Sequence, residues 1–160
     1  MATTRRPGTD LAELTDAVLT ASRVLVGVAA RSLAATEDIS IPQYRALVVL
    51  GGRGPQRPVD LAEALGIDPS TVTRLCDRLV DKRLISRRRQ GTDRREVRLQ
   101  LTARGAQLLE RVTTSRRVEI ERILEAVPAG ERRGLVRAFA IFSSAAGEVP
   151  EAQWPRSWDL

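Results

Sequence analysis

Apolar residues recur at helical spacing along most of the chain, and at two-residue spacing in one short stretch. This pattern predicts a first helix from Asp10, a helix-capping residue, to about Ala35. Its apolar seam is narrow, with alternating steps of three and four positions at Leu11, Leu14, Val18, Ala21, Leu25 and Val28. Such a seam packs either on the chain's own core or partly on a second subunit. The early position of the helix, separate from the rest, favours the second subunit.

The next predicted helix begins after Ser40. Ser40 and Gln43 have the spacing of a capping box, and Pro42 suits the first turn because its missing N–H would have no partner there. We expect this helix to end near Leu50. The following segment, 51–58, contains three glycines and two prolines and is typical of a loop.

Two helices joined by a tight turn are predicted next. The first begins at Pro58 and is stopped by Gly66, and the second begins at Asp68-Pro69 with a cap followed by proline. The second helix is expected to continue to about Lys82. Its apolar face consists of Val72, Leu75, Cys76, Leu79 and Val80. Small hydroxyl residues open this second helix, which is the helix–turn–helix pattern.

A hairpin and two more helices complete the predicted chain. Segments 84–87 and 96–101 alternate apolar and polar residues on either side of a polar tip with Gly91, which predicts a β-hairpin. Thr102 can cap a long helix, which Pro128 and Gly130 interrupt before a final helix. The expected fold is mainly α with a small β-wing, in a single domain. Its parts are helices at 10–36 and 103–147, a winged helix–turn–helix at 37–102 and a tail at 148–160.

Charge changes the picture at the hairpin. Between Lys82 and Arg98 there are eight basic and two acidic residues. The whole chain has 26 basic and 20 acidic residues, a net charge of +6, so the rest of the chain sums to zero. A net charge concentrated in one ribbon indicates contact with a polyanion at one place.

The exposed face of the helix predicted from Asp68-Pro69 to about Lys82 offers candidate DNA contacts. Short side chains at its start would let the backbone approach a major groove, where Arg74 could reach a guanine edge and Arg78 a phosphate. These major-groove candidates are Ser70, Thr71, Thr73, Arg74 and Arg78. A merely solvated helix face is the alternative, and the basic hairpin immediately downstream favours DNA contact.

The hairpin supplies the second set of candidates. Arginines on a narrow ribbon could enter a minor groove, and Asp93 could orient the guanidinium of Arg95. Further arginines at the base of the ribbon would contact phosphates, so that affinity falls with salt. The wing candidates are Arg87, Arg88, Arg89, Asp93, Arg94 and Arg95. A solvated charged turn is the alternative.

Composition argues against catalysis, metals and cofactors. The chain has no histidine and one cysteine, Cys76, on the predicted apolar face of the second helix. No glycine-rich phosphate loop and no evident pair of catalytic carboxylates is present. We therefore expect no enzyme activity, no metal site and no cofactor. We also expect a cytoplasmic protein, with no apolar segment long enough to span a membrane and no signal peptide.

The stretch 61–102 resembles the winged helix–turn–helix of the MarR family of bacterial transcriptional regulators. The resemblance is carried by LAEALGIDPSTVTRLCDRLVDKRLISRR and by Asp93-Arg94-Arg95 before Leu99-Gln100-Leu101-Thr102. It implies a homodimer, built by the first helix and the last two, on a pseudo-palindromic double-stranded operator. It also implies that the protein is more often a repressor than an activator. Recognition helices would lie in successive major grooves, with Arg95 as the minor-groove arginine.

Family resemblance further implies release by a small phenolic or other anionic effector, bound between the dimer helices and the winged domain. Arg31, Tyr44 and Arg45 fall near that junction, although they could equally be ordinary boundary residues. Some relatives sense oxidants through a cysteine near the first helix, a position that Cys76 does not match. A winged-helix module that binds protein rather than DNA is the alternative function, and the charge of the ribbon argues against it.

Overall fold

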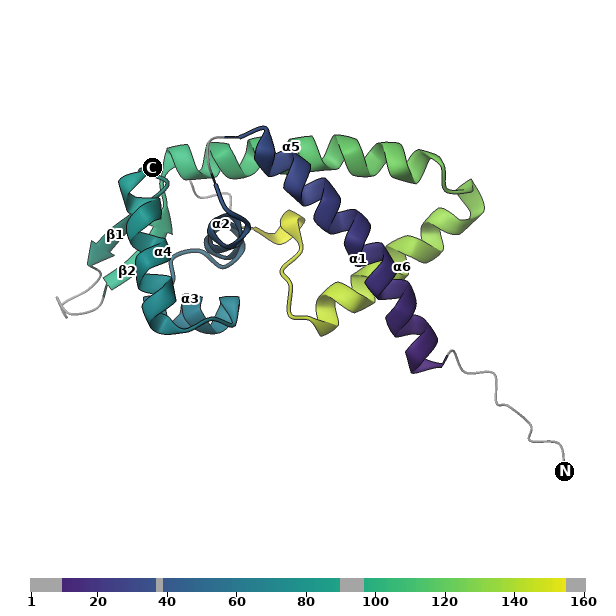
Figure 1. The fold of residues 1–160 in the computed structure, drawn as a ribbon, viewed down its shortest axis with the longest axis horizontal. Helices are drawn as coiled ribbons and strands as arrows, with labels where there is room; N and C mark the ends of the chain where they lie inside the picture. The colour runs from purple at the N-terminus through teal and green to yellow at the C-terminus, as the bar shows by residue number, and fades with distance from the viewer. Residues whose placement is uncertain (1–9, 37–38, 90–96, 155–160) are drawn as a thin grey trace, which may run out of the picture.

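The computed structural model describes residues 10–36, 39–89 and 97–154 as helices around a small hairpin (Figure 1). The elements in chain order are α1 (Leu11–Ala34), α2 (Ile41–Arg53), α3 (Pro58–Leu65), α4 (Pro69–Asp81), β1 (Ile85–Arg89), β2 (Val97–Leu101), α5 (Ala103–Glu125), α6 (Ala129–Ala145) and a short 3-10 helix η1 (Glu151–Gln153). The predicted fold class, mainly α with a β-wing, is confirmed.

Local sequence signals explain where these helices begin. Asp10 and Asp68 each accept a hydrogen bond from the backbone N–H two residues on, and Ser40 and Gln43 form the predicted capping box. Gly66 ends α3 in the left-handed conformation, with φ +63°. Each cap satisfies backbone groups that a helix end leaves unpaired, which sets the boundary independently of packing.

The hydrophobic core lies in the winged helix–turn–helix, around α2. Helices α3, α4 and α5 and strand β2 all contact α2. The largest fully buried side chains come from all of these elements, and include Leu47, Leu50, Leu61, Leu79, Leu99 and Val112. The core thus draws on α2 to α5 and the hairpin, with Leu33 as the contribution of α1 and none from α6 among the described residues.

The wing is a two-stranded antiparallel sheet in which Ile85 pairs with Leu101 and Arg88 with Arg98. Gln56, in the loop before α3, adds a single bridge to Leu99 that the sequence did not suggest. Thr102 joins the sheet to α5, because its hydroxyl donates to the carbonyl of Arg83 at 2.7 Å and accepts from the N–H of Gly105. The wing is thus anchored at its base on both sides.

One predicted boundary is wrong. We expected α2 to end near Leu50, but it continues through Gly51 and Gly52 to Arg53. Neither glycine has a positive φ, whereas the next one, Gly54, does, with φ +73°. The helical conformation of this pair therefore needs an explanation beyond local propensity, because glycine is unfavourable inside helices.

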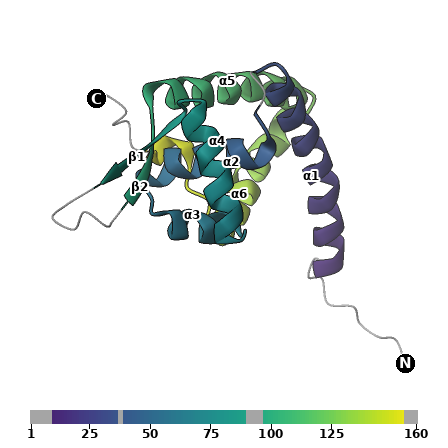
Figure 2. The same cartoon turned by 60° about the vertical axis from the view of Figure 1, so that its left-hand side comes forward.

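Helices α1 and α6 lie largely outside the core. In Figure 2, α1 extends away from the body that α2, α3 and α4 form. Only Val28, Ser32 and Leu33 of α1 are buried, and no residue of α6 is. Alone among the helices of the described residues, α1 is long and apolar enough to cross a membrane by length and composition, contrary to our expectation that no segment would be. Most of this apolar surface has no partner among the residues that the structure describes.

Candidate nucleic-acid interface

The proposed recognition helix, α4, has two sharply different faces. Val72, Leu75, Cys76 and Leu79 are buried in the core, as their spacing predicts. The five candidate residues, Ser70, Thr71, Thr73, Arg74 and Arg78, are all exposed on the remaining surface. Burial of one face holds the other outward, so the structure brings these five residues together on one helix face.

The start of α4 is exposed and is capped by Asp68. The Asp68 carboxylate accepts the Ser70 N–H, and this hydrogen bonding to Ser70 lowers the pKa of Asp68 below its ordinary value. Asp68 therefore stays ionised at neutral pH and keeps the helix capped. Thr73 donates its hydroxyl proton to the Pro69 carbonyl at 3.0 Å, which leaves its oxygen free to accept but not to donate.

Arg87 has a partner that the sequence did not indicate. Its guanidinium donates to Asp77 at 2.5 Å, and both side chains are about half exposed. The pair joins β1 to α4 and so links the wing to the recognition helix. Since an exposed ion pair contributes little to stability, its main effect is to orient these two side chains. The predicted phosphate contact of Arg87 stays a prediction.

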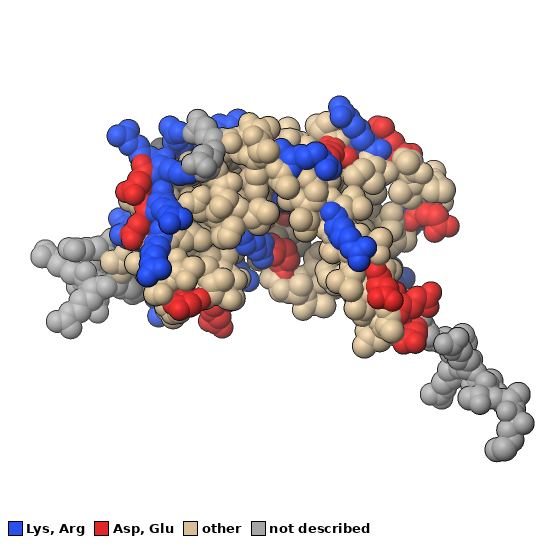
Figure 3. Space-filling model, in the orientation of Figure 1, with Lys and Arg blue, Asp and Glu red and all other residues tan. Residues whose placement is uncertain are grey.

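Positive charge nevertheless dominates the wing. The side chain of Arg88 is exposed, and Arg88 lies opposite Arg98 in the hairpin register. Like charges on paired residues are unfavourable unless a counter-charge is present. Figure 3 shows blue side chains gathered at the end of the molecule that carries α4. The side chain of Arg89, and Asp93, Arg94 and Arg95, lie outside what the structure describes.

The three predicted effector residues do not share one site. Arg31 pairs with Glu119 of α5, whereas Arg45 forms a bidentate pair with Glu148 after α6. Tyr44 is buried, and its hydroxyl lies 3.5 Å from that of Thr113 on α5. The alternative of ordinary boundary residues fits these contacts for Arg31 and Arg45.

Arg116 is a residue at this boundary that sequence reasoning missed. Its guanidinium lies 5.9 Å from the centre of the Tyr44 ring, a cation–π distance. Its Nε atom is buried and has no hydrogen-bond partner among the described residues. A buried donor of this kind is costly unless something satisfies it. Its place on α5, three positions from Thr113, was visible in the sequence, but its approach to Tyr44 was not.

Comparisons with known proteins agree on one family. A family model described as MarR family matches residues 37–96. The uncharacterized HTH-type transcriptional regulator YfiV of Bacillus subtilis is 30% identical over 108 residues, 68% of each chain. The crystal structure of RV1404 from Mycobacterium tuberculosis is 46% identical, with a TM-score of 0.82 over 88% of this chain and 97% of that one. Streptococcus pneumoniae FabT, solved in complex with DNA, shares the fold at 23% identity, with a TM-score of 0.68 over 86% of this chain and 98% of that one.

Cys76 is a packing residue of α4. Its side chain is 2% exposed within the core. Burial raises the pKa of the thiol from its ordinary value of 9.0 to about 11. The thiol is therefore protonated at neutral pH and shielded from solvent, as the apolar spacing of the helix predicts.

We expect Cys76 to react slowly with thiol reagents. The raised pKa alone leaves roughly 100-fold less thiolate at pH 7, and thiolate is the reacting form. The folded protein should therefore react with a disulfide reagent such as DTNB at least ~100-fold more slowly than the same protein in guanidinium chloride, followed by absorbance. Rates within tenfold of each other would mean that Cys76 is accessible, and would reopen a role in oxidant sensing.

Proposed function

Because this chain belongs to the MarR family of transcriptional regulators, we propose that it is a homodimer that binds a pseudo-palindromic double-stranded DNA operator and acts as a repressor. Proteins of this family are transcription regulators rather than enzymes. The observation that carries the proposal is the exposed face of α4 beside a basic hairpin. A helix of this kind reads base edges in a major groove, and a basic ribbon contacts the flanking backbone or minor groove.

Specific and non-specific contacts divide naturally between two arginines of α4. Arg74 follows the helix start, where the hydroxyl residues are short, and its guanidinium can form two hydrogen bonds to guanine. Arg78 lies one turn further along the same exposed face and is suited to a phosphate. The FabT complex with DNA is a precedent for this use of the fold in another protein.

The dimer is supported by the distribution of exposed apolar side chains. Fifteen large apolar side chains are exposed among the described residues, and all but Ile41 and Val59 lie on α1, α5 and α6. A patch of this extent on a soluble protein marks an association surface. A second copy of the chain explains it better than a membrane, because the patch covers three helices and α1 carries Asp16 and Arg23 within its length.

Two-fold symmetry then sets the orientation and spacing of the half-sites in the operator. Two copies of α4 related by a dyad would read inverted half-sites about one helical turn apart, or roughly 34 Å. A dimer held there would obstruct transcription from an overlapping promoter, which is why we assign repression. The division into dimerisation helices at 10–36 and 103–147 and a winged body at 37–102 belongs to the same proposal.

We also propose release by a small phenolic or other anionic effector. Arg116 supports this, because an anion that entered between α2 and α5 would satisfy its buried Nε and lie beside Tyr44. Movement of α5 against α2 would then change the spacing of the recognition helices. Arg31 and Arg45 would contribute only if their present carboxylate partners were displaced.

Arg74→Ala should lower affinity for the operator by about 5- to 150-fold, since a bidentate base contact contributes about 1–3 kcal/mol of discrimination. Fluorescence anisotropy of the purified protein on duplex DNA from upstream of its own gene, with a scrambled duplex beside it, measures this. Arg78→Ala is the matched control. It should weaken binding to both duplexes equally and reduce the slope of log affinity against log salt concentration by about one.

Equal losses on both duplexes for both variants would contradict the assigned roles of the two arginines. Equal and weak binding of the parent protein to both duplexes would leave the wing as a general polyanion contact. It would favour a different operator or the alternative of a protein-binding winged helix.

Phe142→Glu should convert the dimer to monomer at micromolar concentrations. The substitution puts a charge in the exposed apolar surface of α6, and loss of a central aromatic anchor raises a dissociation constant roughly 30-fold or more. Sedimentation velocity measures the change. Val59→Glu, an equally exposed position on α3, should remain dimeric. A dimer that survives Phe142→Glu unchanged would place the subunit interface elsewhere.

Salicylate, a phenolic carboxylate, should lower the anisotropy of the operator complex at millimolar concentrations, because it offers Arg116 an anion and Tyr44 an aromatic ring. Arg116→Gln should raise the concentration required about tenfold, for loss of a charged hydrogen bond. Release that is unaffected by Arg116→Gln would exclude this boundary as the effector site.

A further inference from the structure

The segment that follows α6 folds back across the molecule. Gly147, with φ +68°, ends the helix, and the N–H groups of Gly147 and Glu148 return to the carbonyls of Ser144 and Ser143. In Figure 1, α5 runs away from the winged body, α6 returns, and the segment in yellow reaches α2. We call residues 147–154 the C-terminal strap.

Polar contacts hold the strap to α2 and α5. Glu148 receives two hydrogen bonds from the Arg45 guanidinium of α2, at 2.9 and 2.5 Å. Hydrogen bonding to Arg45 also lowers the pKa of Glu148. Glu151, one turn further, accepts from Arg117 of α5 at 2.9 Å. The strap therefore bridges α2 and α5 as well as continuing from α6.

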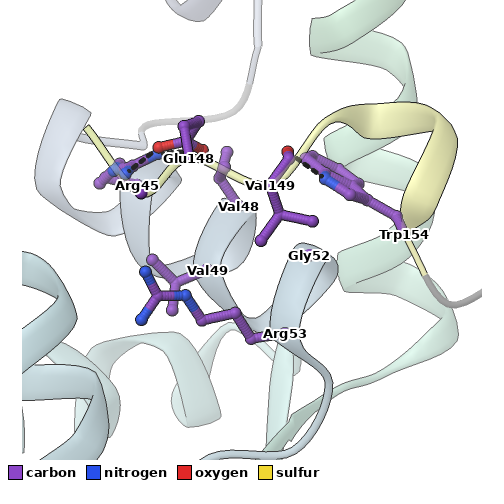
Figure 4. A pocket seen from close by; sticks show the side chains of 9 residues that line it. Arg45, Val48, Val49, Gly52, Arg53, Glu148, Val149 and Trp154 are labelled. Carbon is purple, nitrogen blue, oxygen red and sulfur yellow. Dashed lines mark hydrogen bonds and ion pairs between the residues drawn. The ribbon is translucent and has the colours of Figure 1, made fainter. Parts of the chain in front are cut away.

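The indole of Trp154 is the apolar part of the attachment. Its Nε1–H donates to the carbonyl of Val149 at 3.1 Å, which folds the strap on itself and turns the ring toward α2 (Figure 4). The ring is half-buried and packs against the hydrophobic core. About 10 Å³ of space remains among the strap, Arg45 and Arg53, which is room for at most one water.

The two glycines of α2 form the surface on which this ring lies. A Cβ atom at Gly52 would lie 3.1 Å from Trp154 Nε1, and one at Gly51 would lie 3.3 Å from Cζ3 of the same ring. Both distances are shorter than ordinary van der Waals contact. At Gly51 a Cβ would also lie 2.7 Å from the Leu109 side chain, whereas at Gly52 the three nearest atoms all belong to the indole. The lack of a side chain at both positions thus lets the indole lie close to the helix backbone.

We propose that Gly51, Gly52 and Arg45 of α2 form a binding site for the chain's own C-terminal strap, and that the bound strap sets the position of the winged body relative to α6. The strap continues directly from α6 and contacts α2 through Glu148 and Trp154, so it links the two helices. The effect on DNA rests on the proposed function, in which α6 belongs to the dimer interface. A body tied to α6 presents its recognition helix at a defined distance from that of the partner subunit.

Gly52→Ala combined with Trp154→Ala tests the site without DNA. Alanine normally stabilises a helix relative to glycine. If Trp154 binds on Gly52 as proposed, Gly52→Ala lowers the melting temperature by about 4 °C when Trp154 is present. It raises the melting temperature slightly when Trp154 has been replaced by alanine. Gly130→Ala is the matched control, because no atom lies within 4 Å of its added Cβ, and it should behave alike in both backgrounds.

Emission of Trp154 gives a second readout. The chain contains two tryptophans, so Trp158→Phe leaves Trp154 as the only one. Gly52→Ala in that background should shift its emission to longer wavelength, because the displaced indole enters water. The proposed site would be overturned if Gly52→Ala raised the melting temperature equally with and without Trp154 and left the emission unchanged.

Operator binding then tests the positional effect. Trp154→Ala and Glu148→Gln should each weaken operator binding about tenfold, within the range of coupling between sites, and leave affinity for a scrambled duplex unchanged. Glu151→Gln, which removes only an exposed contact to α5, should have little effect. Operator affinity that does not change while the melting-temperature cycle holds would refute the positional role. If the parent protein binds no operator, the proposed function fails. The melting temperatures of the Gly52 and Trp154 variants still decide whether Trp154 binds on α2.

Discussion

The structure depends on burial of one face of the recognition helix. Val72, Leu75, Cys76 and Leu79 fill the core around α2, and this leaves the polar face of α4 the only one that another molecule can meet. Because the core is close-packed, the helix cannot rotate to expose a different set of side chains. The Asp77–Arg87 pair extends the same constraint to the wing. The residues proposed to face DNA are thus positioned by apolar packing behind them.

The winged body has a packed core, to which α5 and Leu33 of α1 contribute, whereas most of α1 and all of α6 lie outside it. Most large apolar side chains of α6 and of α1 are exposed, and a helix with no buried residue, such as α6, gains little from packing. Burial in a homodimer would supply the missing contacts. Under the proposed function, the molecule thus consists of a winged body with a packed core and of dimerisation helices whose apolar surface is covered only by a second subunit.

Regulation then depends on how the winged body is coupled to the dimerisation helices. Arg31–Glu119 joins α1 to α5, Tyr44 and Arg116 join α2 to α5, and the strap joins α6 to α2. The contact of Arg116 with Tyr44 and that of the strap with α2 cross the boundary between the dimerisation helices and the winged body, and each of the three contacts involves an arginine that another anion could compete for. An effector and the strap would therefore act on the same relative motion.

The sequence by itself determined the order and most boundaries of the elements, because caps, glycine stops and apolar periodicity act over a few residues. Ser40, Gly66, Asp68 and Thr102 all function as predicted, and the exposed face of α4 followed from its period. Only the tertiary structure decided which distant groups meet. The helix continues through Gly51 and Gly52, and Trp154, about a hundred residues later, packs on them. Arg31 and Arg45 likewise turn to carboxylates of α5 and the strap. Such contacts depend on how the elements pack, a property that local spacing does not encode.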